Sequence, residues 1–187
     1  VIFFDRFEAR CRLKPGLIPY PKALLVNQSS VKNLTQTNLS HFALIELMKK
    51  KFKSWGKSIY IGYNSISFDE EFLRKSLFKS LYDPYLTINN GNKRSDLLNI
   101  LRANHIYNPD SIKFPLNNKG KLSFKLDQVA PYNGIEDFNA HDAVGDSIAT
   151  MKLAKLVNEG SPDLWHASLQ TTNREDTNNI IESEKIF

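Results

Sequence analysis

A repeating pattern of apolar residues between Ser40 and Trp55 is the clearest structural signal in the chain. Apolar side chains recur three or four positions apart there, at Phe42, Ile45, Met48, Phe52 and Trp55. This spacing predicts an amphipathic helix, because residues three and four apart share one helix face. The lysine run at 49–51 falls on the other side of this helix. We interpret it as a solvated face, with a phosphate-binding patch as the alternative.

A short run of β-branched and aromatic residues at 58–63 (SIYIGY) predicts a strand. Because the run is nearly all apolar, we expect the strand to be covered on both faces. A helix is predicted directly after it. Ser67 and Glu70 have the spacing of a capping box, and an apolar stripe from Phe72 to Leu81 follows them.

The remaining pattern predicts further helices joined by polar loops. These helices are expected at 96–104, 124–130 and 142–158. Partial alternation of apolar and polar residues over 2–13 predicts a strand with one buried face, followed by a proline-rich loop. The segment 108–121, rich in Pro, Asn, Gly and Lys, predicts a surface loop.

The polarity of the chain changes after the last predicted helix, which Gly160 and Pro162 end. Residues 170–184 have few apolar side chains to bury, so we interpret them as a linker or as the start of another domain. We therefore divide the chain into a domain at 1–160 and a linker or accessory segment at 161–187.

Composition and charge narrow the class of protein. With 187 residues and 41% hydrophobic content, the chain has enough apolar material for one globular α/β domain. No apolar run is long enough to predict a membrane span, so we expect a cytoplasmic protein. The net charge of +5 favours a polyanionic partner.

The most informative polar residue of the predicted helix 142–158 is Asp146. It shares a stripe with Ala149, Leu153 and Val157, a face that should pack against the sheet. A carboxylate on such a face costs free energy unless it is paired, hydrogen-bonded or bound to a metal. The alternative is an acidic residue that the helix dipole favours near an N-terminus.

Two other residues have positions that suggest chemistry. His141 precedes Asp146 by five positions, where its ring could reach a water held near the carboxylate, although this spacing alone is a weak signal. Asp69 stands where the strand at 58–63 gives way to a helix, a place where α/β folds collect ligand-binding groups. A helix cap is the alternative interpretation of Asp69.

Longer blocks around these residues resemble a known family. YIGYNSISFDEEFLRKSLF, then YDPY at 82–85, then SFKLDQVAPYNGIEDFNAHDAVGDSIATMKLAKLV are similar to the exonuclease domain of bacterial exodeoxyribonuclease I, a DEDDh exonuclease. The resemblance extends over residues 5–160. It implies a ribonuclease H-like α/β fold, with a mixed sheet flanked by helices. Because the chain starts with Val1 in a strand-like run, we interpret it as a fragment that lacks the N-terminal strand or strands of this fold.

The resemblance also implies a catalytic role for each of the three residues. Asp69 and Asp146 match metal-binding carboxylates, and His141 matches the general base that activates the attacking water. Phosphodiester hydrolysis by this family uses two divalent cations, Mg²⁺ or alternatively Mn²⁺, which prefer oxygen ligands.

The family's remaining carboxylates form a D-x-E-T motif, which we expect upstream of Val1. Asp5 and Glu8 are unsuitable substitutes, because side chains three apart on a strand point to opposite faces. Asn27, Gln28 and Ser29 replace the family's Thr-Gly-Ile turn, which changes the expected seat of the terminal nucleotide. We therefore expect this chain by itself to bind metal poorly and to be inactive.

The resemblance implies single-stranded DNA as substrate and 5′-mononucleotides as product. Four residues match positions near DNA in the family, although each is also an ordinary surface type: Arg74, Tyr85, Arg102 and Lys125. A monomer that cooperates with single-strand DNA-binding protein in DNA repair is the expected setting. A non-catalytic binding module and a proofreading or RNA-trimming exonuclease are the alternatives.

Overall fold

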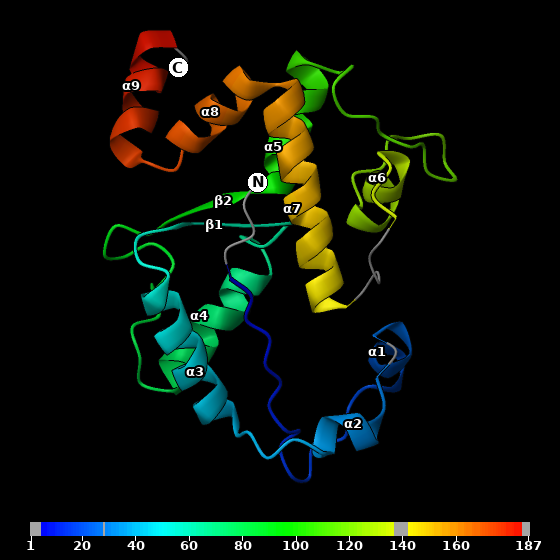
Figure 1. Cartoon of the computed structure of the whole chain (residues 1–187), viewed down its shortest axis with the longest axis vertical. Coiled ribbons are helices and arrows are strands. Elements are labelled where there is room, and N and C mark those ends of the chain that lie inside the picture. Colours follow the sequence, from blue (N-terminus) through cyan, green and yellow to red (C-terminus); the bar gives the residue numbers. More distant parts are fainter. Residues whose placement is uncertain (1–4, 28, 137–141, 185–187) are drawn as a thin grey trace.

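A computed structural model describes residues 5–27, 29–136 and 142–184 of the chain. Two short strands lie at its centre, and helices surround them (Figure 1). Helices α5 and α7 lie at one end of the strands, and α3 and α4 lie together on the other side of the molecule (Figure 1). None of the described helices has the length and apolar character needed to cross a membrane.

Most of the elements along the described chain are helices. They are α1 (Pro21–Val26), α2 (Val31–Thr35), α3 (His41–Ser54), β1 (Ile59–Gly62), α4 (Asp69–Lys79), β2 (Lys93–Asp96), α5 (Leu97–Tyr107), α6 (Leu126–Tyr132), α7 (Ala143–Gly160), α8 (Pro162–Gln170) and α9 (Arg174–Glu184). The predicted helices at 40–55, 96–104, 124–130 and 142–158 are confirmed as α3, α5, α6 and α7, with shifts of a few residues at their ends.

Strands β1 and β2 pair in parallel, with Ile59 opposite Lys93 and Gly62 opposite Asp96. Helix α4 lies in the connection between them, which is the usual way to join parallel strands. The prediction of a strand at 58–63 is confirmed, but the prediction that it is covered on both faces is wrong. Ile59 is 40% exposed, since few side chains of the described chain pack over this end of β1.

The hydrophobic core lies between α5, α6 and α7. Ala149, Leu153 and Val157 of α7 are fully buried in it, which confirms the predicted apolar stripe. Trp165 of α8 packs against the same core and joins α8 to it. The core therefore fixes α7, and with it the position of Asp146 one turn before the buried stripe.

The strand predicted at 2–13 is wrong for its described part. Residues 5–14 form no strand, and their backbone bonds run from Arg12 N to Leu39 O at 2.8 Å and from Leu13 N to Leu34 O at 2.8 Å. A strand needs a neighbouring strand, and neither β1 nor β2 pairs with this segment. The predicted proline loop also contains α1, which starts at Pro21 because proline suits the first helical position.

The capping box predicted for Ser67 and Glu70 is wrong. Phe68 takes the N-cap position of α4 and makes no side-chain cap bond. Instead of turning back to a cap, the Glu70 carboxylate accepts a hydrogen bond from the Thr87 hydroxyl at 2.7 Å and pairs with Arg94 at 3.5 Å. Glu70 therefore joins α4 to β2.

The surface loop predicted at 108–121 is confirmed as irregular structure, with a single antiparallel bridge between Leu116 and Leu122. Beyond α7, α8 follows directly, and α9 forms within 170–184, where the polar composition predicted a linker or the start of another domain. The start of α9 is satisfied locally, because Glu175 N donates to Asn173 Oδ1 at 3.1 Å. The division into domains at residue 160 stays a prediction.

Candidate functional site

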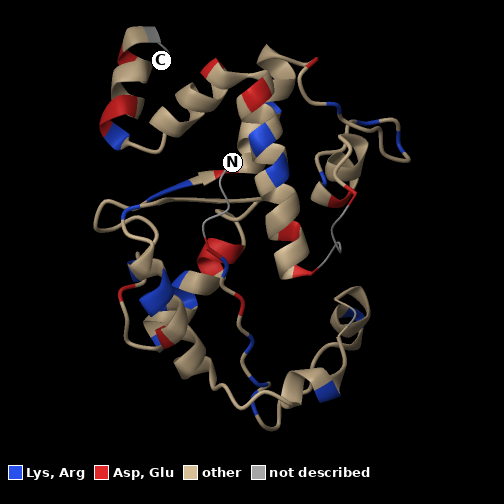
Figure 2. Cartoon of the chain, in the orientation of Figure 1, with Lys and Arg blue, Asp and Glu red and all other residues tan. Residues whose placement is uncertain are grey.

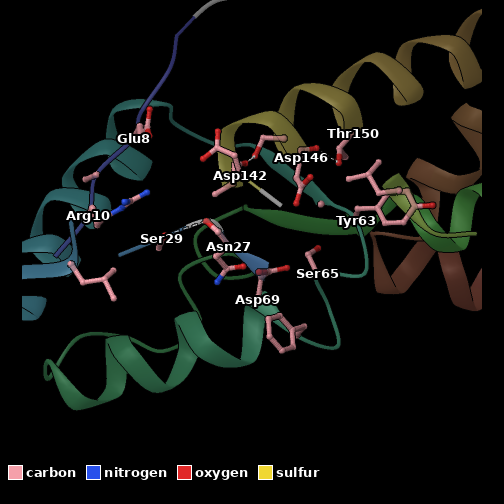
Figure 3. Close-up of a pocket in the computed structure, with 17 residues that line it drawn as sticks. Glu8, Arg10, Asn27, Ser29, Tyr63, Ser65, Asp69, Asp142, Asp146 and Thr150 are labelled. Atoms are coloured by element: carbon pink, nitrogen blue, oxygen red, sulfur yellow. Dashed lines mark hydrogen bonds between the residues drawn. The ribbon is translucent and has the colours of Figure 1, made fainter. Parts of the chain in front are cut away.

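A cavity of about 1120 Å³ lies between the starts of α4 and α7 and the N-terminal segment of the chain. Asp69 from α4 and Asp146 from α7 point into it from opposite sides (Figure 3). Acidic residues mark both helix starts (Figure 2). The two carboxylates are 77 residues apart in the sequence, and the fold brings them to one space.

Asp69 is the first residue of α4, just after the turn that follows β1. Its side chain keeps contact with solvent through the cavity, yet partial burial raises the pKa of its carboxyl. The neighbouring carboxylates of Asp96, Glu70 and Asp146 raise this pKa further. A carboxylate crowded by others in this way favours a proton or a cation.

Asp146 lies in the first turn of α7 and is half-buried at the end of the apolar stripe. One turn later, the hydroxyl of Thr150 donates to the backbone carbonyl of Asp146 at 2.7 Å. His141, the third predicted catalytic residue, lies outside the described residues. Of the predicted catalytic set, the structure thus brings Asp69 and Asp146 together.

The two carboxylates are of a type that binds divalent cations. Mg²⁺ prefers carboxylate oxygens and keeps several water ligands, so two such side chains can hold it together with waters and phosphate oxygens. Among the described residues, no three His, Cys, Asp or Glu side chains are grouped closely enough to hold a metal by themselves. Asp69 and Asp146 would therefore be an incomplete set of ligands by themselves, and their role as ligands stays a prediction.

Asp142 and Glu8 also line the cavity, and sequence reasoning did not select either as a site residue. Asp142 caps α7, and its Oδ2 accepts from Gly145 N at 3.4 Å. Glu8 faces the cavity from the N-terminal segment, whereas Asp5 pairs with Lys51 and accepts from the Trp55 indole at 3.0 Å. The strand used to argue that Asp5 and Glu8 point to opposite faces is absent from the described residues 5–14, and both residues line a second hollow of about 450 Å³.

Asp96 is a further residue that the sequence did not single out. It is the last residue of β2, is only 4% exposed, and accepts hydrogen bonds from three backbone amides. The signal available in the sequence was an acidic residue directly before a helix, which predicts no more than a cap.

The segment that departs from the family pattern reaches the cavity. Asn27 and Ser29 line it, as does Arg10, and Gln28 lies outside the described residues. Figure 3 shows Arg10 and Ser29 on the side of the cavity away from Asp146, with Asn27 drawn between them and Asp69.

The predicted DNA-binding residues fall into two groups. Arg74 and Tyr85 line a separate hollow of about 250 Å³ together with Arg94, and Arg74 pairs with Glu71 at 2.6 Å. This hollow lies on the far side of the first turn of α4 from Asp69, since Glu70 and Glu71 line it.

Arg102 and Lys125 belong to the other group. Arg102 is exposed on α5, and its guanidinium donates a hydrogen bond to Asn99 Oδ1 at 3.4 Å. Burial raises the pKa of the Tyr63 hydroxyl, and the positive charge of Arg102 partly opposes this increase. Lys125 is exposed at the N-cap of α6, next to Leu126 in the cavity wall. The role of all four residues stays a prediction.

Comparison with known proteins finds relatives of this chain in both sequence and structure, although no protein-family model matches it. Exodeoxyribonuclease I of Escherichia coli is 33% identical over 156 residues, which cover 83% of this chain and 33% of the relative. Exodeoxyribonuclease I of Buchnera aphidicola subsp. Acyrthosiphon pisum is 43% identical over 106 residues, covering 56% and 26%. The chain is homologous to part of exodeoxyribonuclease I.

A solved structure of E. coli exonuclease I with a dT13 oligonucleotide has a TM-score of 0.83 to this chain. Its sequence identity is 30%, and the match covers 89% of this chain and 36% of the other. The likeness confirms the predicted α/β, ribonuclease H-like fold. The chain spans about a third of the length of the exodeoxyribonuclease I relatives that it matches.

Proposed function

We propose that this chain supplies part of the active site of a metal-dependent 3′→5′ exonuclease that hydrolyses single-stranded DNA to 5′-mononucleotides during DNA repair and recombination. The observation that carries the proposal is the convergence of Asp69 and Asp146 on one cavity. Homology to exodeoxyribonuclease I supports the assignment of the reaction.

In this proposal Asp69 and Asp146 hold divalent cations, Mg²⁺ or alternatively Mn²⁺. When bound, such cations activate a water and neutralise charge on the phosphate and the leaving oxygen. A bound cation would offset the unfavourable surroundings of the Asp69 carboxylate, whose pKa is raised by burial and by neighbouring carboxylates. His141 serves as the general base toward the attacking water.

The substrate proposal rests on the E. coli relative, which has been solved with a dT13 and a dA16 oligonucleotide. Binding of both homopolymers agrees with recognition of the DNA backbone and stacking of bases rather than with reading of a sequence. In this chain Phe68 lines the cavity and is 58% exposed, which offers a ring for stacking next to Asp69. Arg74, Tyr85, Arg102 and Lys125 supply further contacts to the strand.

The proposal extends to a protein partner and a cellular setting. Complexes of exonuclease I with SSB and with SSB-Ct have been solved. We therefore propose that single-strand DNA-binding protein cooperates with the protein that contains this chain, which acts as a cytoplasmic monomer.

The direct test is release of nucleotides from a single DNA strand labelled at its 3′ end, with and without Mg²⁺. Replacement Asp146→Ala in the full-length protein should lower the rate by about 100-fold or more, because a metal ligand is lost. Equal rates for the two proteins contradict the role of Asp146. Faster release from RNA than from DNA favours an RNA-trimming enzyme, and binding of DNA without any release favours a non-catalytic module.

A further inference from the structure

The buried carboxylate of Asp96 joins two parts of the chain that are distant in sequence. Its Oδ1 accepts from Asn64 N at 2.7 Å and from Leu98 N at 3.1 Å, and its Oδ2 accepts from Ile66 N at 3.1 Å. Leu98 belongs to α5, whereas Asn64 and Ile66 form the turn between β1 and α4. Asp96 therefore caps α5 and also holds a turn that is some thirty residues away.

The turn that Asp96 holds has a demanding backbone. Asn64 has a φ of 57°, in the left-handed region that residues other than glycine rarely adopt. A Cβ atom at Gly62 would clash with the side chain of Ser65, so the chain folds back sharply between these residues. Such a turn persists only where the surrounding structure fixes it, and the Asp96 bonds to Asn64 and Ile66 do so.

The same turn sets the start of α4. The carbonyl of Ser65 accepts from Glu70 N at 2.9 Å and from Phe68 N at 3.3 Å, which ties the first turn of the helix to the residue between the two Asp96 contacts. The side chain of Glu70 is fixed on the other side by Thr87 and Arg94. Asp69 lies between these attachments, and its carboxyl faces the cavity (Figure 3).

We propose that Asp96 is a positioning residue, which holds Asp69 in place for cation binding through the turn at residues 64–66. This inference rests on the proposed function, because it assigns Asp69 to a cation. The negative charge of Asp96 also favours a cation at Asp69, because it adds to the negative potential around that carboxylate. A cap alone would need only the bond to Leu98, and the two bonds to the turn are what separate positioning from capping.

Two substitutions separate the cap from the positioning role. Asp96→Asn and Asp96→Ser both keep an oxygen for Leu98 N, since Asn and Ser are favoured N-caps. Asp96→Asn loses the acceptor for Ile66 N, and Asp96→Ser is too short to reach the turn. We expect Mn²⁺ affinity, measured by calorimetry, to fall by about 10- to 100-fold, as for other residues that orient a metal ligand, with the larger loss for Ser.

Two readouts keep this effect apart from a general loss of structure. Amide hydrogen exchange at Asn64 and Ile66 should accelerate in both variants by about tenfold or more. In nucleotide release, kcat should fall while KM for single-stranded DNA stays the same. The matched control is Asn104→Ala, which removes a buried side chain of the same helix far from the turn and should lower the melting temperature without changing Mn²⁺ affinity.

The outcomes are distinct. If the wild-type protein binds Mn²⁺ and both Asp96 variants bind it within about twofold of wild type, the positioning role is wrong and Asp96 is only a cap. Equal losses of Mn²⁺ affinity in Asn104→Ala and the Asp96 variants also overturn it, because the effect is then general destabilisation. All of these measurements use the full-length protein that contains this chain; if its wild-type form binds no Mn²⁺, the proposed function fails and this inference fails with it.

Discussion

Two polar clusters in this protein have opposite characters. Around Asn104, neutral side chains form hydrogen bonds with one another. Asn104 donates to Ser161 at 2.8 Å and accepts from Ser111 at 3.0 Å, and Asn108 donates to Ser161 at 2.8 Å. Around the cavity, carboxylates crowd one another, and the pKa of Asp69 is raised by burial and further by these neighbours. The first cluster joins α5 to the start of α8 through neutral hydrogen bonds, whereas the second gathers negative charge around Asp69.

The contrast indicates which cluster serves stability and which serves function. A buried amide whose donors and acceptors are all partnered stabilises a fold and specifies its packing. The Asp69 carboxyl, whose pKa is raised, costs stability at neutral pH, a cost that cation binding would remove. Substitutions in the Asn104 cluster should therefore change stability, and those around the cavity should change cation affinity.

The largest effect on stability is expected from Asn104→Ala. Asn104 is 0% exposed, and its removal leaves a cavity and takes one hydrogen-bond partner each from Ser161 and Ser111, which remain bonded to each other and to Asn108. The free energy of unfolding, measured by urea denaturation, should fall by about 2–3 kcal/mol. A loss below about 0.5 kcal/mol would mean that water replaces the amide and that this cluster is not a structural anchor.

A smaller loss is expected from Tyr63→Phe, at the boundary between the core and the cavity. The Tyr63 hydroxyl donates to Phe124 O at 2.6 Å, and burial raises its pKa, so that it stays a protonated donor. Loss of this bond should lower the free energy of unfolding by about 1 kcal/mol. Mn²⁺ affinity should not change, and a parallel loss of affinity would assign Tyr63 to the cation site instead.

The smallest effect on stability is expected from Asp69→Asn, which should stabilise the protein rather than destabilise it. The folded-state pKa of Asp69 is raised above its ordinary value of 3.8, so its contribution to stability is complete below that pH and is lost as pH rises through the folded-state pKa. At neutral pH and without metal, Asp69→Asn should therefore raise the melting temperature by about 1–2 °C, a small gain because solvent screens the group.

The gain from Asp69→Asn should disappear below the ordinary pKa of 3.8, where the wild-type carboxyl is protonated in both states. Differential scanning calorimetry at neutral and acidic pH checks this. An Asp69→Asn protein that is less stable than wild type at neutral pH would mean that the carboxylate has a stabilising partner, and the contrast between the clusters would not hold.

The parts of the site that depend on local pattern could be predicted from sequence. The stripe that carries Asp146 follows from helical periodicity, and Asp69 follows from the junction of a strand and a helix. Both signals are contained within about four helical turns of chain, so no knowledge of tertiary contacts was needed.

Features that depend on distant contacts could not be predicted. Asp96 looks like an ordinary cap in the sequence, because its bonds to Asn64 and Ile66 cross 32 and 30 residues. The strand expected at 2–13 failed for the same reason, since alternation shows that a segment could pair but not that a partner strand is adjacent. Helix α9 was missed because it depends on local capping by Asn173 and not on an apolar stripe.

The central claim is that Asp69 and Asp146 together bind a divalent cation. Calorimetric titration of Mn²⁺ into the full-length protein in its wild-type, Asp69→Asn and Asp146→Asn forms at neutral pH tests it most directly, with Asn104→Ala as control. Each aspartate variant should lose about 10- to 100-fold in affinity while the control keeps the wild-type value. Affinities of both aspartate variants within about twofold of wild type would contradict the account.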